Sequence, residues 1–577
     1  AEIKSLYQRA GIAHVLAISG LHISLLGMGL YRLLRKRLHT QYVTAALATT
    51  VFLISYAVLS GNGVSTQRAV GMCLIYLFAD VTGYAYDMLN ALGIVVLVLL
   101  WKNPFLLSYS GFVFSVMAVI AIGVGANVLL EWEHSWKRRQ QAGEETIKKT
   151  FFSRQKEGIL VSFAIQLFTI PLVAYSYYEI PVYAMLINLF VLAVVNGLLG
   201  LTVLGVIVGM AFLPAGRVLF APCGWMLDSY RFLCEVSLKI PGAQRITGKP
   251  AHMRIFWYYL GLGVFLLAIY ACARRNEKHK DCRETADLCV SRRKKRLQGI
   301  VFSCFIAFLL LFLLFPQKKS FEIDFLDVGQ GDGIYLCTGG GTSMFIDGGS
   351  TDVKQVGKYR ILPFLKAKGV SEISYWFVSH TDTDHVSGLK EVLVSGYRVE
   401  YLVFAKAVEK EAKTKELAEL ASSHGTKVLY MQAGDTVRSK RAAMRCLYPK
   451  ASDKAEDVND LCLVLQFEEG DIRALFGGDI STDVEEQLSR REKWDKVLIF
   501  KADHHGSRYA NAEALLKCIR PEITVASAGK DNRYGHPSPD AVQRIKESGS
   551  RFFCTIEGGR IRVRVIENKL VCETYVK

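Results

Sequence analysis

The sequence lacks several patterns that would each point to a familiar class of protein. Its thirteen cysteines are scattered, with no pair spaced as C-x-x-C, so neither a zinc ribbon nor a disulfide scaffold is indicated. No Walker-type phosphate-binding loop is present, so any ATP that drives this protein has to act through another protein. There is also no initiator methionine and no signal peptide, and we therefore expect further sequence before residue 1.

The length and composition indicate a membrane protein with two parts. The chain has 577 residues, too many for one hydrophobic core, and 51% of them are hydrophobic, with a positive mean hydropathy. Residues 1–315 hold nearly all the long apolar runs, whereas residues 317–577 show the alternating strand and helix patterns of an α/β or α+β domain. We therefore predict a polytopic α-helical membrane domain followed by a separate water-soluble domain.

Ten apolar segments in the first part are candidate membrane spans. They are Gly11 to Leu33, Tyr42 to Leu59, Thr66 to Val81, Leu89 to Trp101, Phe105 to Leu130, Gly158 to Tyr177, Val182 to Leu213, Arg217 to Leu238, Arg254 to Cys272 and Ile300 to Phe315. Three basic segments, near residues 32–37, 131–157 and 274–298, account for much of the net charge of +17. Four spans separate each from the next, so the positive-inside rule places all three in the cytoplasm. The last span then runs outward, and the C-terminal domain is extracytoplasmic.

Polar residues inside the predicted spans are candidates for lining a channel, because such residues are costly in a membrane. His14, Ser19 and His22 lie in the run H-V-L-A-I-S-G-L-H-I-S, broadly on one side of a helix. Arg68 follows in G-N-G-V-S-T-Q-R-A-V-G-M, at the start of a span. The competing interpretations are an arginine that snorkels to the membrane interface, and glycines that only allow close helix packing.

The densest polar cluster of the chain is S-H-T-D-T-D-H-V-S-G, which directly follows a predicted buried strand at residues 373–378. It contains four potential metal ligands, His380, Asp382, Asp384 and His385. Ligands that converge at a strand end could hold two divalent cations with a shared hydroxide. The competing interpretation, a solvated polar loop, would leave charges without partners beside a buried strand.

Other predicted strands also end in polar turns. D-V-G-Q-G-D-G follows the strand at residues 321–326, and Asp347 follows the strand at residues 343–346. The strand at 473–476 leads into Gly-Gly-Asp479, and the strand at 497–500 leads into K-A-D-H-H-G-S. Each of the first two turns could be simple hairpin chemistry.

The order of these motifs resembles the ComEC family, the membrane channel that bacterial competence systems use to import single-stranded DNA. The resemblance rests on H-V-L-A-I-S-G-L-H-I-S, then G-N-G-V-S-T-Q-R-A-V-G-M, then F-L-D-V-G-Q-G-D-G and S-H-T-D-T-D-H, and it spans essentially the whole chain. Family members usually begin with further membrane segments and an OB-fold domain, which are absent here, so the resemblance implies an N-terminally truncated member.

The resemblance also implies that residues 317–577 form a metallo-β-lactamase-like αββα sandwich. Asp347 would then orient a metal-binding histidine without contacting the metal itself, and Asp479 would bridge two metal ions. His505 is the preferred remaining metal ligand and His504 its neighbour or a substrate contact, because adjacent residues on an extended segment point to opposite sides. His536, in Y-G-H-P-S-P, could reach a scissile phosphate or be an ordinary surface histidine. The role of Asn459 and Asp460 is open.

The expected cofactors are two divalent ions held by His380, Asp382, Asp384, His385, Asp479 and His505. The wider superfamily has H-x-H-x-D-H where this chain has Asp382 in place of the middle histidine. Because the site gains an oxygen ligand and loses a nitrogen ligand, Mn²⁺ is favoured, with Zn²⁺ or Mg²⁺ as alternatives.

These inferences predict a DNA-uptake protein of natural transformation, joined to a metal-dependent nuclease or phosphodiesterase. Asp384 and Asp479 would accept the proton of the attacking water, and His504 or His536 would stabilise the transition state or protonate the leaving oxygen. The expected partners are single-stranded DNA, the lipid bilayer, a DNA receptor and a cytoplasmic ATP-driven motor.

Two alternatives belong to other functional classes. One is a membrane-anchored hydrolase of a wall or lipid phosphodiester, although one span would suffice for an anchor. The other is a channel whose metal domain only binds DNA, although a domain without catalysis would be free to lose its ligands.

Overall fold

The structure is a computed structural model, and it describes residues 2–12, 20–140, 151–278, 286–316, 319–455, 457–567 and 569–576. The chain divides into two compact units, Ala1–Phe315 and Pro316–Lys577. We call them the helical unit and the sheet unit, and each is described by itself.

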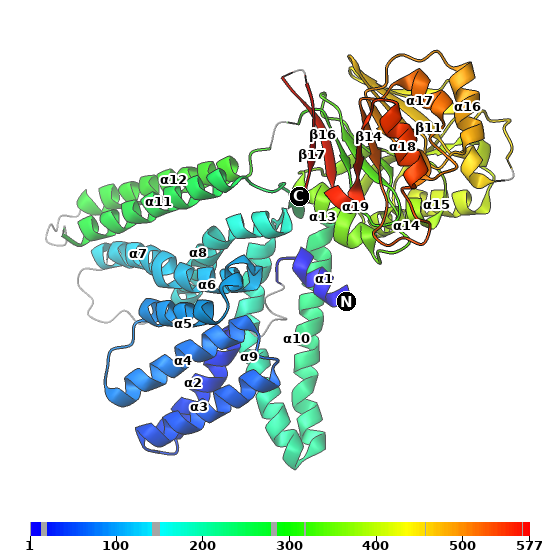
Figure 1. Cartoon of the computed structure of the whole chain (residues 1–577). Coiled ribbons are helices and arrows are strands. Elements are labelled where there is room, and N and C mark those ends of the chain that lie inside the picture. The colour runs from blue at the N-terminus through cyan, green and yellow to red at the C-terminus, as the bar shows by residue number, and fades with distance from the viewer. Residues whose placement is uncertain are drawn as a thin grey trace. The chain divides into compact units, whose positions relative to one another are not determined.

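The helical unit consists of helices joined by short connections, with a two-stranded sheet of β1 (Glu179–Pro181) and β2 (Gln244–Ile246) (Figure 1). Its helices are α1 (Glu2–Arg9), α2 (Gly20–Lys36), α3 (Tyr42–Leu59), α4 (Val64–Thr82), α5 (Met88–Lys102), η2 (Pro104–Ser108), α6 (Ser110–Ile120), η3 (Ala121–Ala126), α7 (Asn127–Gln140), α8 (Phe151–Tyr177), α9 (Ala184–Ala211), α10 (Leu213–Lys239), α11 (His252–Lys278) and α12 (Ala286–Leu313). Every one of the ten predicted spans overlaps at least one of these helices.

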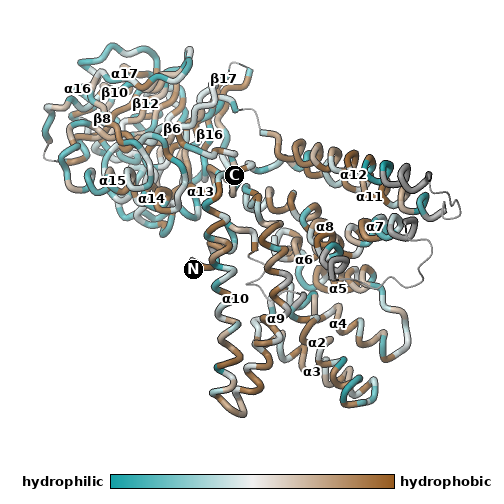
Figure 2. Tube along the Cα trace, turned by 180° about the vertical axis from the view of Figure 1, so that it is seen from behind, coloured by the Kyte–Doolittle hydropathy of each residue, from teal (hydrophilic) through white to brown (hydrophobic). Residues whose placement is uncertain are grey.

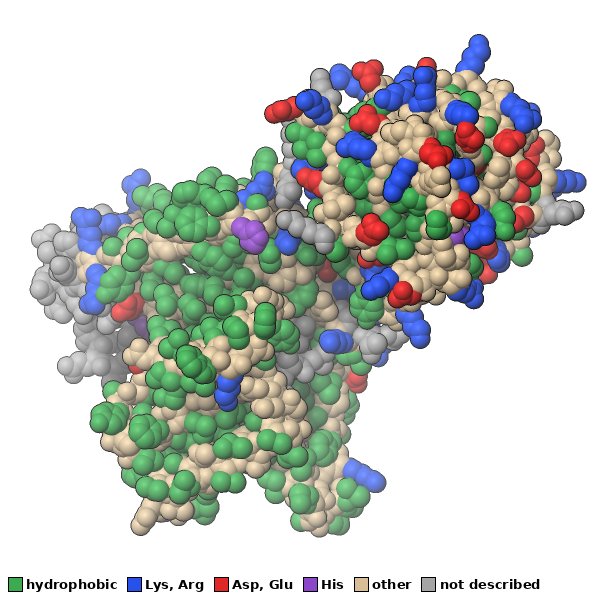
Figure 3. All heavy atoms as spheres, viewed as in Figure 1, with side chains coloured by type: hydrophobic (Ala, Val, Ile, Leu, Met, Phe, Trp, Pro, Cys, Tyr) green, Lys and Arg blue, Asp and Glu red, His purple; other side chains and the backbone are tan. Residues whose placement is uncertain are grey.

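The outer surface of these helices is strongly apolar. Trp101 is 93% exposed and Met210 is 85% exposed, and Figures 2 and 3 show hydrophobic residues along most of this unit. Five segments within the described residues are long and apolar enough to cross a membrane: Tyr42–Leu59, Ser110–Trp136, Lys156–Tyr177, His252–Asn276 and Arg293–Leu313. Such a surface is stable against lipid and costly in water. The helical unit is therefore built as a membrane domain.

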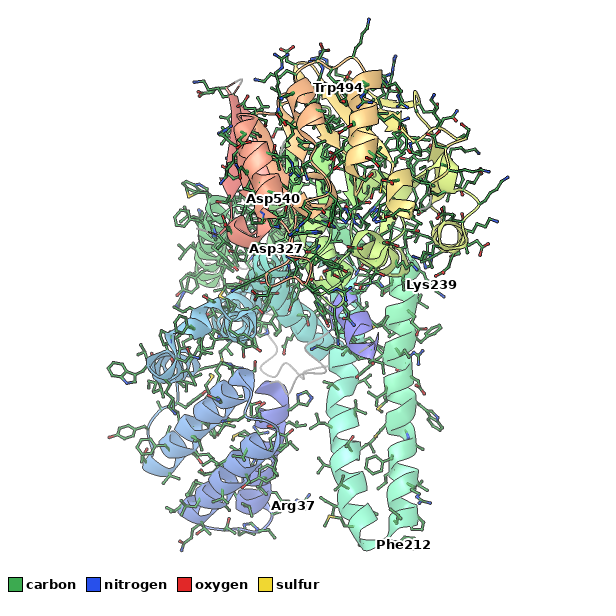
Figure 4. All side chains as sticks on the ribbon, turned by 45° about the vertical axis from the view of Figure 1, so that its right-hand side comes forward. Arg37, Phe212, Lys239, Asp327, Trp494 and Asp540 are labelled. Atoms are coloured by element: carbon green, nitrogen blue, oxygen red, sulfur yellow. The ribbon has the colours of Figure 1, made fainter. Side chains whose placement is uncertain are left out.

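Helices α9 and α10 form a long hairpin, with Phe212 at its turn and Lys239 at the far end of α10 (Figure 4). Near the turn, a Cβ atom added to Gly216 would lie 2.5 Å from the Cα atom of Gly209. Only glycine at position 216 allows this approach, so the two backbones pack directly on one another.

The sheet unit contains two large mixed sheets. One has the order β17-β16-β3-β4-β5-β6-β7-β8, and the other β15-β14-β13-β12-β11-β10-β9. The first comprises β3 (Glu322–Phe325), β4 (Gly333–Cys337), β5 (Ser343–Asp347), β6 (Glu372–Phe377), β7 (Arg398–Ala405), β8 (Lys427–Met431), β16 (Ile561–Ile566) and β17 (Lys569–Thr574). The second comprises β9 (Thr436–Ser439), β10 (Ala442–Tyr448), β11 (Val464–Glu469), β12 (Ile472–Phe476), β13 (Ile499–Lys501), β14 (Ile523–Ala526) and β15 (Arg551–Cys554).

Three hydrophobic cores divide this unit into four layers. The central core joins the inner faces of both sheets, with Phe325 and Phe467 among its buried residues. A second core packs the eight-stranded sheet against α13 (Leu362–Ala367), α14 (Thr383–Val394) and α15 (Ala412–Ser423). A third packs the seven-stranded sheet against α16 (Thr482–Arg491), α17 (Glu513–Ile519) and α18 (Pro539–Glu547). The predicted αββα sandwich is therefore confirmed.

Strand direction decides where polar residues gather. Strands β5 to β8 are parallel, as are β12 to β15, so the carboxyl ends of each set lie at one edge of its sheet. A backbone hydrogen bond from Leu463 N to Ser379 O, 2.9 Å, joins a loop of one sheet to a loop of the other at this edge. The turns after the strands therefore meet between the sheets.

The central core generates a stability prediction. Replacing Phe467, which is fully buried and stacks on Phe321, with alanine should lower the free energy of unfolding of the sheet unit by about 3–5 kcal/mol. Tyr359→Ala removes an exposed ring and should change it by less than about 0.5 kcal/mol. Urea unfolding of purified residues 316–577 measures both, and equal effects would contradict this assignment of the core.

Candidate metal centre

Five turns at the strand ends supply the polar residues of one buried site. The β3–β4 turn carries Asp332, β5 ends at Asp347, and the cluster of residues 380–385 runs from the turn after β6 into the first turn of α14. On the other sheet, Asp479 follows β12, and the short helix η7 (Asp503–Gly506) follows β13. The fold thus brings together residues that lie more than 170 positions apart.

The inner part of the site is formed by His385, Asp479 and His505. The Nε2 atoms of the two histidines lie 3.4 Å and 3.3 Å from the same carboxylate oxygen, Oδ2 of Asp479, and Nε2 of His505 lies 3.7 Å from Oδ2 of Asp384. Both Nε2 atoms are buried and have no hydrogen-bond partner among the described residues. Imidazole and carboxylate donors aimed at one point fit a divalent metal ion.

In both imidazole rings the other nitrogen, Nδ1, has a hydrogen-bond partner. Asp347 Oδ2 lies 3.0 Å from Nδ1 of His385, and the same carboxylate accepts hydrogen bonds from N and Oγ of Ser379. Nδ1 of His505 donates to the carbonyl oxygen of Ser527 at 2.9 Å. Because these acceptors hold a proton on Nδ1, Nε2 is the nitrogen that can bind a metal once its own proton is displaced.

His380 and Asp382 form an outer part of the site. The ring centres of His380 and His385 are 4.0 Å apart, and Nε2 of His380 lies 3.9 Å from Oδ2 of Asp382. The Asp382 side chain is 45% exposed, and its other oxygen pairs with Lys413 of α15 at 2.9 Å. Lys413 therefore competes with any cation for this carboxylate.

The prediction that His504 and His505 point to opposite sides of an extended segment was wrong. These residues are not extended: both have left-handed backbones, with φ of 47° and 54°, within η7. Their Nε2 atoms do not diverge but both approach Oδ2 of Asp479, at 3.9 Å and 3.3 Å. What distinguishes them is burial, since His505 is enclosed and His504 is partly exposed. His504 is therefore the more accessible of the two rings.

His536 lies beside the centre rather than on a distant surface turn. Its ring centre is 5.5 Å from that of His504 and 6.2 Å from that of His505. On its outer side it stacks on Tyr534 at 5.7 Å, and the guanidinium of Arg533 lies 4.8 Å from that tyrosine ring. These rings make a line of aromatic groups from the surface to the centre.

Asp332 and Lys501 belong to the site, although neither was predicted from the sequence. Nζ of Lys501 lies 2.5 Å from Oδ2 of Asp332 and 3.6 Å from Oδ1 of Asp479, and it donates to the carbonyl of Gly478. Asp332 approaches the Nδ1 sides of His385 and His505, at 3.8 Å and 3.6 Å, so it supports the ligands from behind. The sequence signal that could have identified Lys501 is the presence of a lysine within the apolar run L-I-F-K-A.

The electrostatics divide the histidines into two classes. Burial disfavours the charged ring at His385 and His505, but the carboxylates around them, Asp479 above all, outweigh it and raise both pKa values well above the usual range. Burial lowers the pKa of His380 and that of His536 to about 4, and also lowers that of His504. These three rings are therefore neutral at pH 7. The pKa of Asp479 is held low by His505, His385 and Lys501, against the effect of burial.

The predicted channel residues have different outcomes. His14 and Ser19 lie outside the described residues, and His22 lies in the first turn of α2. Arg68 lies on α4 and is 6% exposed, so the interpretation as a snorkelling interfacial arginine was wrong. Asp460, whose role was open, accepts a hydrogen bond from Ser481 N and caps the turn before α16.

The Lys501 ion pair predicts a measurable stability cycle. Lys501→Met leaves Asp332 and Asp479 buried without their cation and should cost about 3–5 kcal/mol of unfolding free energy. The double variant Lys501→Met, Asp332→Asn removes one of the two unbalanced charges and should recover a large part of this loss. Urea unfolding in EDTA measures the cycle, and a cost below about 1 kcal/mol for Lys501→Met would contradict a buried ion pair.

Comparison with known proteins identifies relatives along the whole chain. A family model described as Competence protein matches residues 1–271. The ComE operon protein 3 of Bacillus subtilis (strain 168) is 26% identical over 581 residues, covering 98% of this chain and 69% of that protein. Recombination protein 2 of Haemophilus influenzae is 24% identical, covering 98% of this chain and 70% of that protein.

One solved structure, the metallo-beta-lactamase fold protein YhfI from Bacillus subtilis, aligns with 42% of this chain and 100% of YhfI, at 11% identity and a TM-score of 0.31. The family model matches within the helical unit, and the relatives extend the similarity through the sheet unit. The chain is therefore similar to competence proteins of the ComEC type over both units.

Proposed function

We propose that this protein takes up DNA, with the helical unit passing a single strand across the cell membrane and the sheet unit cutting phosphodiester bonds outside it. The observation that carries the cutting activity is the convergence of two buried Nε2 atoms and two carboxylates on one point between the sheets. Similarity to competence proteins supports DNA as substrate and other competence proteins as partners.

The residues fit two divalent cations. His385, His505, Asp479 and Asp384 would hold the inner one, and His380 and Asp382, with Asp479 between, the outer one. When bound, such ions supply a hydroxide at neutral pH and neutralise charge on a phosphate oxygen. Carboxylate oxygens make up half of this donor set, so Mn²⁺ is favoured over Zn²⁺ or Mg²⁺.

The protein's own groups perform the remaining chemistry. Asp384 and Asp479 face the same point as the metal ligands and would accept the proton of the attacking water. His504 and His536 are neutral at pH 7, so they would donate hydrogen bonds to phosphate oxygens in preference to protons. The exposed Tyr534 and Arg533 beside them offer a stacking surface and a positive charge to an unpaired base and its backbone.

The location and partners follow from the sequence of spans and loops. With basic segments near 32–37, 131–157 and 274–298 in the cytoplasm, the sheet unit faces outward, where incoming DNA arrives. A DNA receptor would deliver the strand there. Because the chain has no Walker-type loop, a cytoplasmic ATP-driven motor would supply the energy.

Nuclease assays test the cutting activity. Purified residues 316–577 should cut DNA with Mn²⁺ and lose activity in EDTA. His385→Ala and Asp479→Asn should lower the rate by about 100-fold or more, because even residues that only orient metal ligands contribute about 10- to 100-fold.

His424→Ala is the matched control, since this exposed histidine follows α15 and lies outside the site. It should leave the rate unchanged. A folded, metal-loaded domain that cuts no DNA but hydrolyses a wall or lipid phosphodiester would replace the proposed substrate, and one that binds DNA without hydrolysis would exclude the enzyme.

Metal binding should depend strongly on pH. Without metal, His385 and His505 have raised pKa values, so a cation must displace their protons, and affinity should fall by about tenfold per pH unit for each displaced proton as pH falls from 8 to 6. Titration calorimetry of Mn²⁺ in buffers of different ionisation enthalpy counts the released protons. Affinity that is equal at pH 6 and pH 8 would show that the histidines are not ligands.

A further inference from the structure

Arg68 is a buried cation in the interior of the helical unit. Its Nε donates to Oγ of Ser115 on α6 at 2.7 Å, and Nη1 contacts the sulfur of Met72 at 3.2 Å. Its Nη2 atom lies against Gly20 of α2, since a Cβ atom on Gly20 would lie 2.9 Å from it. A hydroxyl and a thioether carry no charge, so these contacts satisfy part of the guanidinium's hydrogen bonding and none of its charge.

The segments around Arg68 provide no carboxylate for it. Between residues 3 and 130 the sequence contains only two acidic residues, Asp80 and Asp87. Asp80 is twelve residues further along α4, about 18 Å away at the helical rise, and accepts from the hydroxyl of Tyr31. Asp87 caps α5 by accepting from Asn90 N. A buried guanidinium without a counter-charge is unfavourable, so this position favours binding an anion.

We propose that Arg68 binds a phosphodiester of the single DNA strand in transit. This proposal rests on the proposed uptake function and adds a specific binding site to it. The guanidinium has free N–H groups in the planar geometry that suits phosphate oxygens. The position favours DNA over a lipid headgroup, because Arg68 is enclosed by α2, α4 and α6 whereas the lipid-facing side of α4 exposes residues such as Phe78.

Ser115→Asp is the sharpest test, because it gives Arg68 an internal counter-ion at the position of its present partner. A DNA site of this kind should be blocked by that carboxylate while the fold is kept. Arg68→Gln removes the charge, Arg68→Lys keeps it, and Arg32→Gln is the matched control on the exposed face of α2.

The experiment uses the full chain in nanodiscs of zwitterionic lipid with EDTA, and an oligonucleotide of 4-thiothymidine as photo-cross-linking probe. Mass spectrometry should map cross-links to peptides of α2, α4 or α6 in the unaltered protein. Ser115→Asp and Arg68→Gln should lower their yield by about tenfold, the effect of one charge-assisted contact, while Arg68→Lys retains part of it and Arg32→Gln all of it. The melting temperature of Ser115→Asp should equal or exceed that of the unaltered protein.

Three results would overturn the proposal. They are helical cross-links that persist in Ser115→Asp and Arg68→Gln, a Ser115→Asp variant that melts earlier, and a phospholipid that copurifies and is lost in Arg68→Gln without any helical cross-link. Cross-links to the sheet unit serve as the reference. If cross-links to the sheet unit persist while cross-links to α2, α4 and α6 are absent, the Arg68 site is excluded but the proposed uptake function is not. If the unaltered protein gives neither cross-links nor metal-dependent cutting, the proposed function fails as well.

Discussion

The ion pair between Lys501 and Asp332 is the constraint on which the candidate centre depends. Four carboxylates, Asp332, Asp347, Asp384 and Asp479, lie around His385 and His505 at the junction of two sheets, and Lys501 is the one lysine among the described residues that reaches them from within. Burial alone would drive protons onto these acids, but Lys501 and the histidines keep the pKa values of Asp332 and Asp479 low. Lys501 neutralises part of the negative charge of these carboxylates, and the remaining negative charge can attract cations.

A second pair of buried acids, Asp503 and Glu485, lies next to the same turn, and their pKa values are raised instead of lowered. Asp503, the first residue of η7, is buried beside Glu485 of α16, whose carboxylate accepts hydrogen bonds from the backbone N of Asn511 and Ala512. Burial, together with Glu485, raises the pKa of Asp503 well above its usual range, so the pair retains a proton. Asn511 hydrogen-bonds to the Asp503 backbone and to Glu485, and so joins α16 to the turn that carries the left-handed His504 and His505.

Much of the sheet unit could be predicted from its sequence, because candidate ligands such as His380 and Asp479 follow apolar strands and parallel strands end at a common edge. The histidine pair was different: its two left-handed residues lie in a turn whose contacts reach Asn511 and, through it, Glu485, and no local pattern encodes these contacts. Lys501 was missed because its partner, Asp332, lies 169 residues earlier in a turn that resembles hairpin chemistry. The burial of Arg68 likewise depends on Ser115, 47 residues away on another helix.

The two units leave opposite charges unbalanced. Around His385 the acids exceed the single lysine, and the fold tolerates this surplus because divalent cations can neutralise it. Around Arg68 the surplus is positive, in a part of the chain almost free of acids. A polyanion with a divalent counter-ion matches both requirements: its phosphates can be neutralised by cations at the sheet unit and by arginine in the helical unit. Charge selection would then operate twice on one strand, first where it is cut and again where it passes.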